Sequence, residues 1–156
     1  LNQGMQPIAG YNFGAKLYGR VNKVLRLTII YATAVTTFGF LVGMLVPDLV
    51  VGIFTSDAEL TELSVTGLRI TVMFFPIIGF QMVTSNFFQS IGMAGKAIFL
   101  SLTRQMRILL PCLLILPQFF GVAGVWYSMP VSDLLASLIA LVMLVCQFRK
   151  FRTSPL

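Results

Sequence analysis

Residues 27–46 read "LTIIYATAVTTFGFLVGMLV", twenty consecutive residues without a charged side chain. The hydrocarbon core of a bilayer is about 30 Å thick, so a helix needs roughly 20 apolar residues to cross it. Inside lipid, every backbone N–H and C=O has to be hydrogen-bonded within the segment, which a helix achieves alone. This stretch therefore predicts a membrane-spanning helix.

The composition of the whole chain agrees with a membrane protein. Of the 156 residues, 57% are hydrophobic and only 10% are charged, whereas a soluble domain carries roughly a quarter charged residues. We expect an all-α integral membrane protein with about four transmembrane helices. The expected spans are residues 27–46, 68–91, 98–118 and 130–148, after the tail of a preceding helix in residues 1–8.

The third and fourth spans are bounded less sharply than the others. A charge-free window at 108–127 competes with 98–118 for the third span, but it contains two prolines and two glycines. We favour 98–118, with residues 121–129 as an outer turn. Ser128 is then the predicted N-cap of the fourth helix, and Pro130 lies in its first turn.

The charges are distributed asymmetrically about these spans. All basic residues except Arg69 fall in the connections on one side, and all five acidic residues are expected in or beside the loops on the other. By the positive-inside rule the basic side is cytoplasmic, so we expect a multi-pass protein of the cell membrane with its C-terminus inside and residues 47–67 outside. The net charge of +6 therefore reflects orientation and not a nucleic-acid partner.

Several kinds of site are unlikely from the residues present. The chain has no histidine, and Cys112 and Cys146 are expected at different membrane depths, so neither a disulfide nor a bound metal or other cofactor is predicted. Gly10, Gly14 and Lys16 do not have the spacing of a nucleotide phosphate loop. No nucleophile, base and orienting group occur together, and we therefore expect no enzyme.

A polar face runs along the second span. Gln81, Thr84, Ser85 and Gln89 are spaced i, i+3, i+4 and i+8, which places them on one side of a helix, while Asn86 falls on another side. Polar side chains avoid lipid, so this face is expected to look toward neighbouring helices or a wet cavity. Hydrogen bonding between helices and direct contact with a transported substrate both remain open.

Prolines and small residues predict how the helices bend and pack. Pro76 removes a backbone hydrogen bond, so a kink is expected there and at Gly79. Pro7 and Pro111 are further kink or hinge candidates. A small-residue stripe in the first span predicts close packing against another helix; it consists of Ala32, Thr36, Gly39 and Gly43.

Arg104 and Arg107 lie three residues apart, on one face of an α-helix. We expect them to reach membrane lipid phosphates at the cytoplasmic surface. The alternative is a gate contact with another part of the protein.

Taken together, several short segments resemble the multidrug and toxic compound extrusion (MATE) family, in order and at the family's spacing. They are residues 6–16 (QPIAGYNFGAK), 53–60 (IFTSDAEL), 89–92 (QSIG), 104–105 (RQ), 120–126 (FGVAGVW) and 130–133 (PVSD). The resemblance implies the last third of a twelve-helix, two-lobe transporter, in which residues 1–156 form part of the second six-helix lobe. It further implies export of organic, often cationic, compounds in exchange for Na⁺ or H⁺, with the rest of the transporter's own chain as partner. Gln6, beside Pro7, joins the candidates for the substrate path.

One departure from the family concerns ion coupling. Some members use a membrane-embedded carboxylate in the tenth helix, yet the corresponding residues 68–91 contain no Asp or Glu, so the coupling ion stays undetermined. Two other functions remain open. One is a flippase for lipid-linked saccharide or peptidoglycan precursors, which should have a more cationic cavity, and the other is a scaffold subunit that transports nothing.

Overall fold

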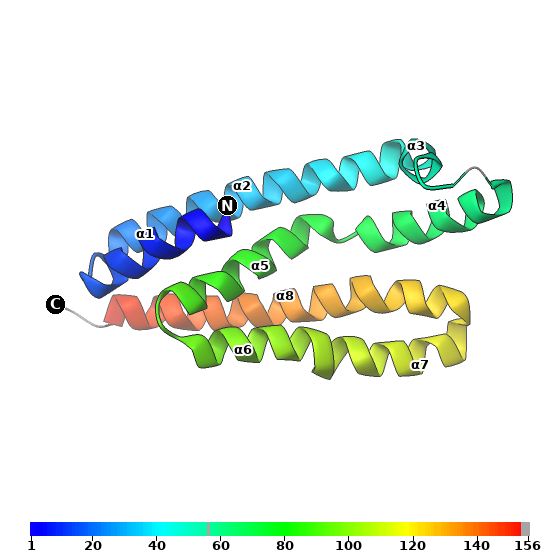
Figure 1. Cartoon of the computed structure of the whole chain (residues 1–156). Helices are drawn as coiled ribbons and strands as arrows, with labels where there is room; N and C mark the ends of the chain where they lie inside the picture. Colours follow the sequence, from blue (N-terminus) through cyan, green and yellow to red (C-terminus); the bar gives the residue numbers. More distant parts are fainter. Residues whose placement is uncertain (56, 154–156) are drawn as a thin grey trace.

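The computed structural model describes residues 1–55 and 57–153, with side chains described as far as residue 150. Every regular element in these ranges is helical. In chain order they are α1 (Asn2–Gly14), α2 (Tyr18–Leu45), α3 (Pro47–Gly52), α4 (Ala58–Val72), α5 (Phe75–Ser90), α6 (Ala94–Leu102), a π-helix (Thr103–Leu109), α7 (Leu110–Phe120) and α8 (Val122–Thr153) (Figure 1).

Three uninterrupted helical stretches among the described residues are long and apolar enough to cross a bilayer: Tyr18–Leu45, Ala94–Phe120 and Val122–Lys150. A fourth crossing is obtained if α4 and α5, which meet at a bend of 50°, are counted as one broken span. Figure 1 shows these long elements running side by side, with α5 between α2 and the hairpin of α6, α7 and α8. The predicted all-α membrane architecture with about four spans is confirmed.

The first helix is longer than the eight residues expected from the sequence. It continues to Gly14, and the chain reverses only around Lys16, whose φ is 60°. Pro7 lies within this helix. Gly10 explains how α1 packs so closely, because a Cβ at this position would lie 2.9 Å from the carbonyl oxygen of Ser90 on α5.

The last helix also starts earlier than expected. Residues 122–129 are helical, and Ser128 lies inside α8, where its hydroxyl donates to the carbonyl oxygen of Gly124 instead of capping a helix start. The turn between α7 and α8 is made at Gly121, which has a φ of 58°. Gly124 has no side chain to separate α8 from the end of α7, and a Cβ there would overlap the carbonyl oxygen of Leu116. A tight turn between two complete helices leaves fewer backbone groups unpaired in lipid than a nine-residue loop would.

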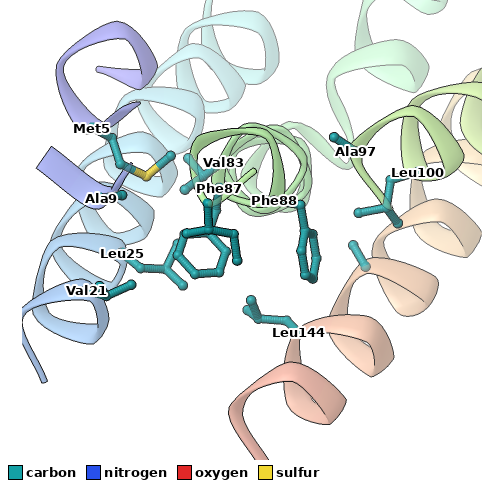
Figure 2. Close-up of a cluster of buried hydrophobic side chains, with 12 residues drawn as sticks. Met5, Ala9, Val21, Leu25, Val83, Phe87, Phe88, Ala97, Leu100 and Leu144 are labelled. Atoms are coloured by element: carbon teal, nitrogen blue, oxygen red, sulfur yellow. The ribbon is translucent and has the colours of Figure 1, made fainter. Parts of the chain in front are cut away.

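The core lies where α5 passes between α1, α2, α6 and α8 (Figure 2). Phe87 and Phe88 of α5 are completely buried there, with Val21 and Leu25 of α2 on one side and Leu144 of α8 on another. Large apolar side chains on the outer sides of the spans are instead exposed, as expected for surfaces that face lipid. The helix that carries the polar face is thus the central helix of this bundle.

The small-residue stripe of α2 packs against α4 and α5, as the sequence predicted. A Cβ at Gly79 would lie 2.7 Å from Oγ1 of Thr36 and 3.0 Å from the carbonyl oxygen of Ala32. Further along, a Cβ at Gly43 would lie 3.0 Å from a methyl group of Val72. The missing side chains therefore let α2 and the broken span approach each other closely.

Candidate functional site

The break between α4 and α5 lies beside the candidate site. α4 ends at Val72, and α5 begins at Phe75 with Pro76 in its first turn. Proline has no N–H to continue the hydrogen bonding of a preceding helix, and the two helices meet at 50° beside it. Gly79, one turn further, sits against α2. The bend turns the polar residues of α5 toward α6 and the π-helix.

The four residues of the predicted polar face do not share one environment. Gln81 and Thr84 are buried, Ser85 is half-buried and Gln89 is exposed. The hydroxyl of Thr84 donates to the carbonyl oxygen of Phe80 in its own helix, and that of Ser85 lies 3.4 Å from the carbonyl oxygen of Ala97 on α6. Only part of this face is therefore available to bind anything else.

Gln81 differs from its neighbours. Its side chain is 3% exposed, and its Oε1 atom has no hydrogen-bond partner among the described residues. A buried polar atom without a partner costs about 1–3 kcal/mol. Gln81 is thus a buried acceptor that lacks a donor.

The structure brings Gln6 and Asn86 together. Nε2 of Gln6 on α1 lies 3.5 Å from Oδ1 of Asn86 on α5, while Nδ2 of Asn86 donates to the carbonyl oxygen of Met82 at 2.9 Å. These two candidates are 80 residues apart in sequence and make a direct contact between helices. Pro7 follows Gln6 within α1.

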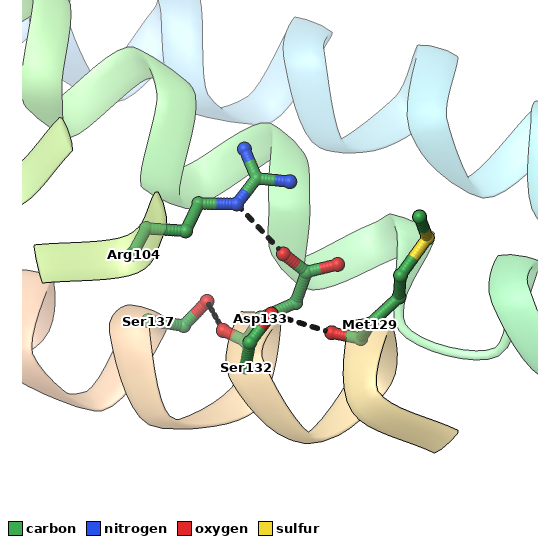
Figure 3. Close-up of polar contacts among 5 residues, drawn as sticks. All are labelled: Arg104, Met129, Ser132, Asp133 and Ser137. Carbon is green, nitrogen blue, oxygen red and sulfur yellow. Dashed lines mark hydrogen bonds and ion pairs between the residues drawn. The ribbon is translucent and has the colours of Figure 1, made fainter. Parts of the chain in front are cut away.

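Arg104 forms an ion pair with Asp133 of α8 (Figure 3). Nε of Arg104 donates to Oδ1 of Asp133 at 2.8 Å, and the side chains are 29% and 5% exposed respectively. Asp133 lies eleven residues after Val122, which is about 16 Å along α8, and Arg104 is about 15 Å from the start of α6. Both groups are therefore near the middle of their membrane-spanning helices.

This position corrects the expectation that all carboxylates lie in or beside outer loops. Pro130 favours a helix start just before Asp133, whereas α8 begins eight residues before Pro130. A signal was present in the sequence: residues 122–148 contain a single charged side chain, that of Asp133. Read as one long span, this run would have placed the carboxylate within the membrane.

Arg104 and Arg107 do not act as a pair. They lie in a π-helix, in which hydrogen bonds run from i to i+5, so residues three apart no longer lie on one face as they do in an α-helix. The guanidinium of Arg107 lies 5.4 Å from the ring centre of Phe99, while Arg104 reaches α8. Pro111 follows this π-helix, in the first turn of α7. π-Helical turns within α-helices are frequent at functional sites.

Two small pockets meet at Arg104 and Gln105. The first has a volume of about 280 Å³, and the second about 170 Å³. Besides the two shared residues, the first is lined by Thr71, Phe75, Ile78, Leu109, Met129, Ser132 and Asp133, and the second by Gln81, Met82, Ser85, Asn86 and Ser101. The 280 Å³ pocket is partly apolar, and the 170 Å³ pocket is largely polar. Gln105 and Ser132 are further residues of this site, and in the sequence they belong to the segments RQ and PVSD.

Comparison with known proteins gives a consistent result. The family model described as MatE matches residues 1–114. The multidrug export protein MepA of Staphylococcus aureus (strain MSSA476) is 26% identical over 141 residues, which are 90% of this chain and 31% of MepA. The chain thus spans about a third of the length of the curated relatives it matches.

Solved structures share the fold. One, described as protein A, is 37% identical, with a TM-score of 0.89 over 98% of this chain and 34% of that one. Another is an inward-facing conformation of a multidrug resistance MATE family transporter of the MOP superfamily; it is 20% identical, with a TM-score of 0.90 over 99% of this chain and 36% of that one. The bent and paired helices described above are therefore an arrangement found in proteins of known structure.

Proposed function

Because this chain belongs to the MATE family, we propose that it supplies helices to a membrane antiporter that exports drugs or other organic, often cationic, compounds in exchange for Na⁺ or H⁺. The relatives named above include a multidrug export protein and a multidrug resistance transporter. The membrane concerned is the cell membrane, with the basic ends of the helices and the C-terminus on the cytoplasmic side. Lipids contact the exposed apolar faces of the spans.

The observation that carries this proposal is the pair formed by Arg104 and Asp133. Ionisable side chains are costly at membrane depth, and where they occur they mark substrate or ion pathways. Arg104 lines two pockets, and the one that Asp133 also lines includes Thr71 and Phe75, on either side of the break between α4 and α5. Broken helices are typical of the binding sites of secondary transporters. A scaffold that only packs against partners has no need of such an arrangement.

A flippase for lipid-linked saccharides is the weaker alternative. Such a protein should have a strongly cationic cavity for its anionic cargo. In this site, Arg104 is the cationic group that lies at mid-membrane among the described residues. Its charge is balanced by Asp133. The pair therefore offers no net positive charge to attract an anionic cargo.

Drug accumulation tests the proposal. The native protein that contains this sequence is expressed in a drug-sensitive bacterium, and ethidium or fluoroquinolone accumulation is measured with and without imposed Na⁺ and pH gradients. We expect lower accumulation, dependent on one of the two gradients. Unchanged accumulation under all conditions, with the protein present in the membrane, would refute the antiporter function.

A narrower experiment separates substrate contact from packing on α5. Gln81 and Ser85 line the 170 Å³ pocket, whereas Thr84 bonds only to its own helix. Gln81→Leu and Ser85→Ala should change drug preference at normal protein levels, and Thr84→Ala should leave it unchanged. If the first two variants lose the protein from the membrane instead, their role is in packing.

A further inference from the structure

The guanidinium of Arg104 is only partly used by the protein. Arginine has five N–H donors, and Figure 3 shows one contact, from Nε to Asp133. Within the described side chains, no hydrogen bond is made by either Nη atom. At membrane depth an unpaired donor is expensive, because lipid offers no acceptor. Donors are therefore available at a point where two pockets meet.

Polar side chains line the 170 Å³ pocket beside Arg104. They are those of Gln81, Ser85, Asn86, Ser101 and Gln105. Oε1 of Gln81 is itself buried and has no partner among the described residues, so it does not open onto the pocket. The N–H groups of Arg104 are therefore the charged donors that this pocket offers to a ligand.

The 280 Å³ pocket has a different lining. Phe75, Ile78, Leu109 and Met129 contribute apolar side chains to it, next to the charged pair. Ligand pockets in proteins combine an apolar lining with a few convergent polar groups in this way. The two pockets together fit a molecule with an apolar body and a polar head.

The charges select among such molecules. Arg104 and Asp133 are already neutral as a pair, so a ligand with a net charge would bring an uncompensated charge to membrane depth. A zwitterion brings none. Its carboxylate can accept two hydrogen bonds from the Nη atoms, the geometry in which arginine binds carboxylates most strongly, while Asp133 retains Nε and holds the guanidinium in place.

We propose that Arg104, positioned by Asp133, is the carboxylate-binding group of a site for zwitterionic amphipathic compounds. The proposal deepens the function proposed above and rests on it. According to this proposal, a pair of side chains on two helices recognises the class of substrate. Export of a compound then depends on whether its carboxylate is free or esterified.

Two dyes test the proposal directly. Rhodamine 110 carries a free carboxylate and is a zwitterion, whereas rhodamine 123 is its methyl ester and a cation. Binding of each is measured by fluorescence polarisation on the purified native protein that contains this sequence, and export is measured in cells. The variants are R104Q/D133N, which removes both charges without leaving one unpaired, and the control Arg69→Gln, at an exposed position that lines neither pocket.

We expect the double variant to lose rhodamine 110 affinity by about tenfold or more, since the hydrogen bonds lost are charge-assisted. Rhodamine 123 affinity should change less than twofold, and Arg69→Gln should change neither. An equal loss for both dyes, or an unchanged affinity for rhodamine 110, would overturn the proposal. Export of ethidium by the unmodified protein decides the antiporter function separately from this outcome.

A second variant covers the case in which the double variant does not reach the membrane. Arg104→Lys keeps the positive charge near Asp133 but loses the two parallel N–H groups of the guanidinium. Rhodamine 110 affinity should then fall while rhodamine 123 affinity is retained. Retention of both affinities by this variant would equally contradict the role assigned to the guanidinium.

Discussion

Nε of Arg104 lies 2.8 Å from Oδ1 of Asp133 and joins the π-helix to α8 near the middle of both spans. The Asp133 side chain is 5% exposed, so its carboxylate depends on this contact for a countercharge. The pair therefore links the stability of the hairpin to the chemistry of the site.

Removing one member of the pair should destabilise the protein more than removing both. Arg104→Gln leaves a buried carboxylate without its cation, and the expected loss is about 3–5 kcal/mol. R104Q/D133N should recover much of that loss. Thermal unfolding in detergent measures both, with Arg69→Gln as a control expected within about 0.5 kcal/mol of the unmodified protein. A double variant no more stable than Arg104→Gln would contradict the prediction.

Gly79→Ala should separate α2 from α5. The added methyl group would lie 2.7 Å from Oγ1 of Thr36 and 3.0 Å from a backbone oxygen, and the backbone oxygen cannot move aside without shifting the helix. We expect a loss of about 1–3 kcal/mol in thermal unfolding. Gly95→Ala is the matched control, because nothing lies within 4 Å of its Cβ. Equal effects of the two substitutions would show that close approach at Gly79 is unimportant.

Gln147→Leu should destabilise the protein, because it removes the hydrogen bond that Lys96 makes with α8. Nζ of Lys96 donates to Oε1 of Gln147, whose side chain is 2% exposed, and lies 5.3 Å from the ring centre of Phe88. The variant leaves the ammonium group with the ring but without this acceptor, and we expect a loss of about 1–3 kcal/mol.

The exposed Gln118 provides the control for that experiment, since Gln118→Leu removes an amide at the end of α7. Lys96→Met in the Gln147→Leu background should restore part of the stability by removing the unpaired charge. If the Lys96 and Gln147 substitutions are simply additive, the hydrogen bond between the two side chains contributes nothing.

Cysteine labelling tests the orientation of the helices. With Cys112 and Cys146 replaced by alanine, Glu59→Cys in α4 should react with a membrane-impermeant maleimide in intact cells, because residues 47–67 are expected outside. Gly95→Cys, at the start of α6, should react only after permeabilisation. The reverse pattern would overturn the orientation that the basic residues predict.

Much of the fold could be predicted from the sequence. Residues 27–45 of the first expected span lie within α2, and the small-residue stripe, in which Thr36 lies beside Gly79, packs as expected. These features can be predicted because they depend on local properties, namely the hydropathy of twenty consecutive residues and the size of individual side chains in one helix. The ends of helices are harder to predict, since Pro130 favours a helix start but lies inside α8. In a membrane span, neighbouring groups can satisfy the backbone that a proline leaves unpaired.

The sequence by itself determined that this protein lies in a membrane, how many spans it has, and that the basic residues gather at one end of those spans. Only the tertiary structure decided that Arg104 meets Asp133, twenty-nine residues away, and that Arg104 lines a pocket together with Gln81 of α5. The physical reason is that hydropathy and charge act along one helix, whereas a contact between two helices depends on their rotation and register. Those are set here by the π-helix around Arg104 and by the close approach at Gly124.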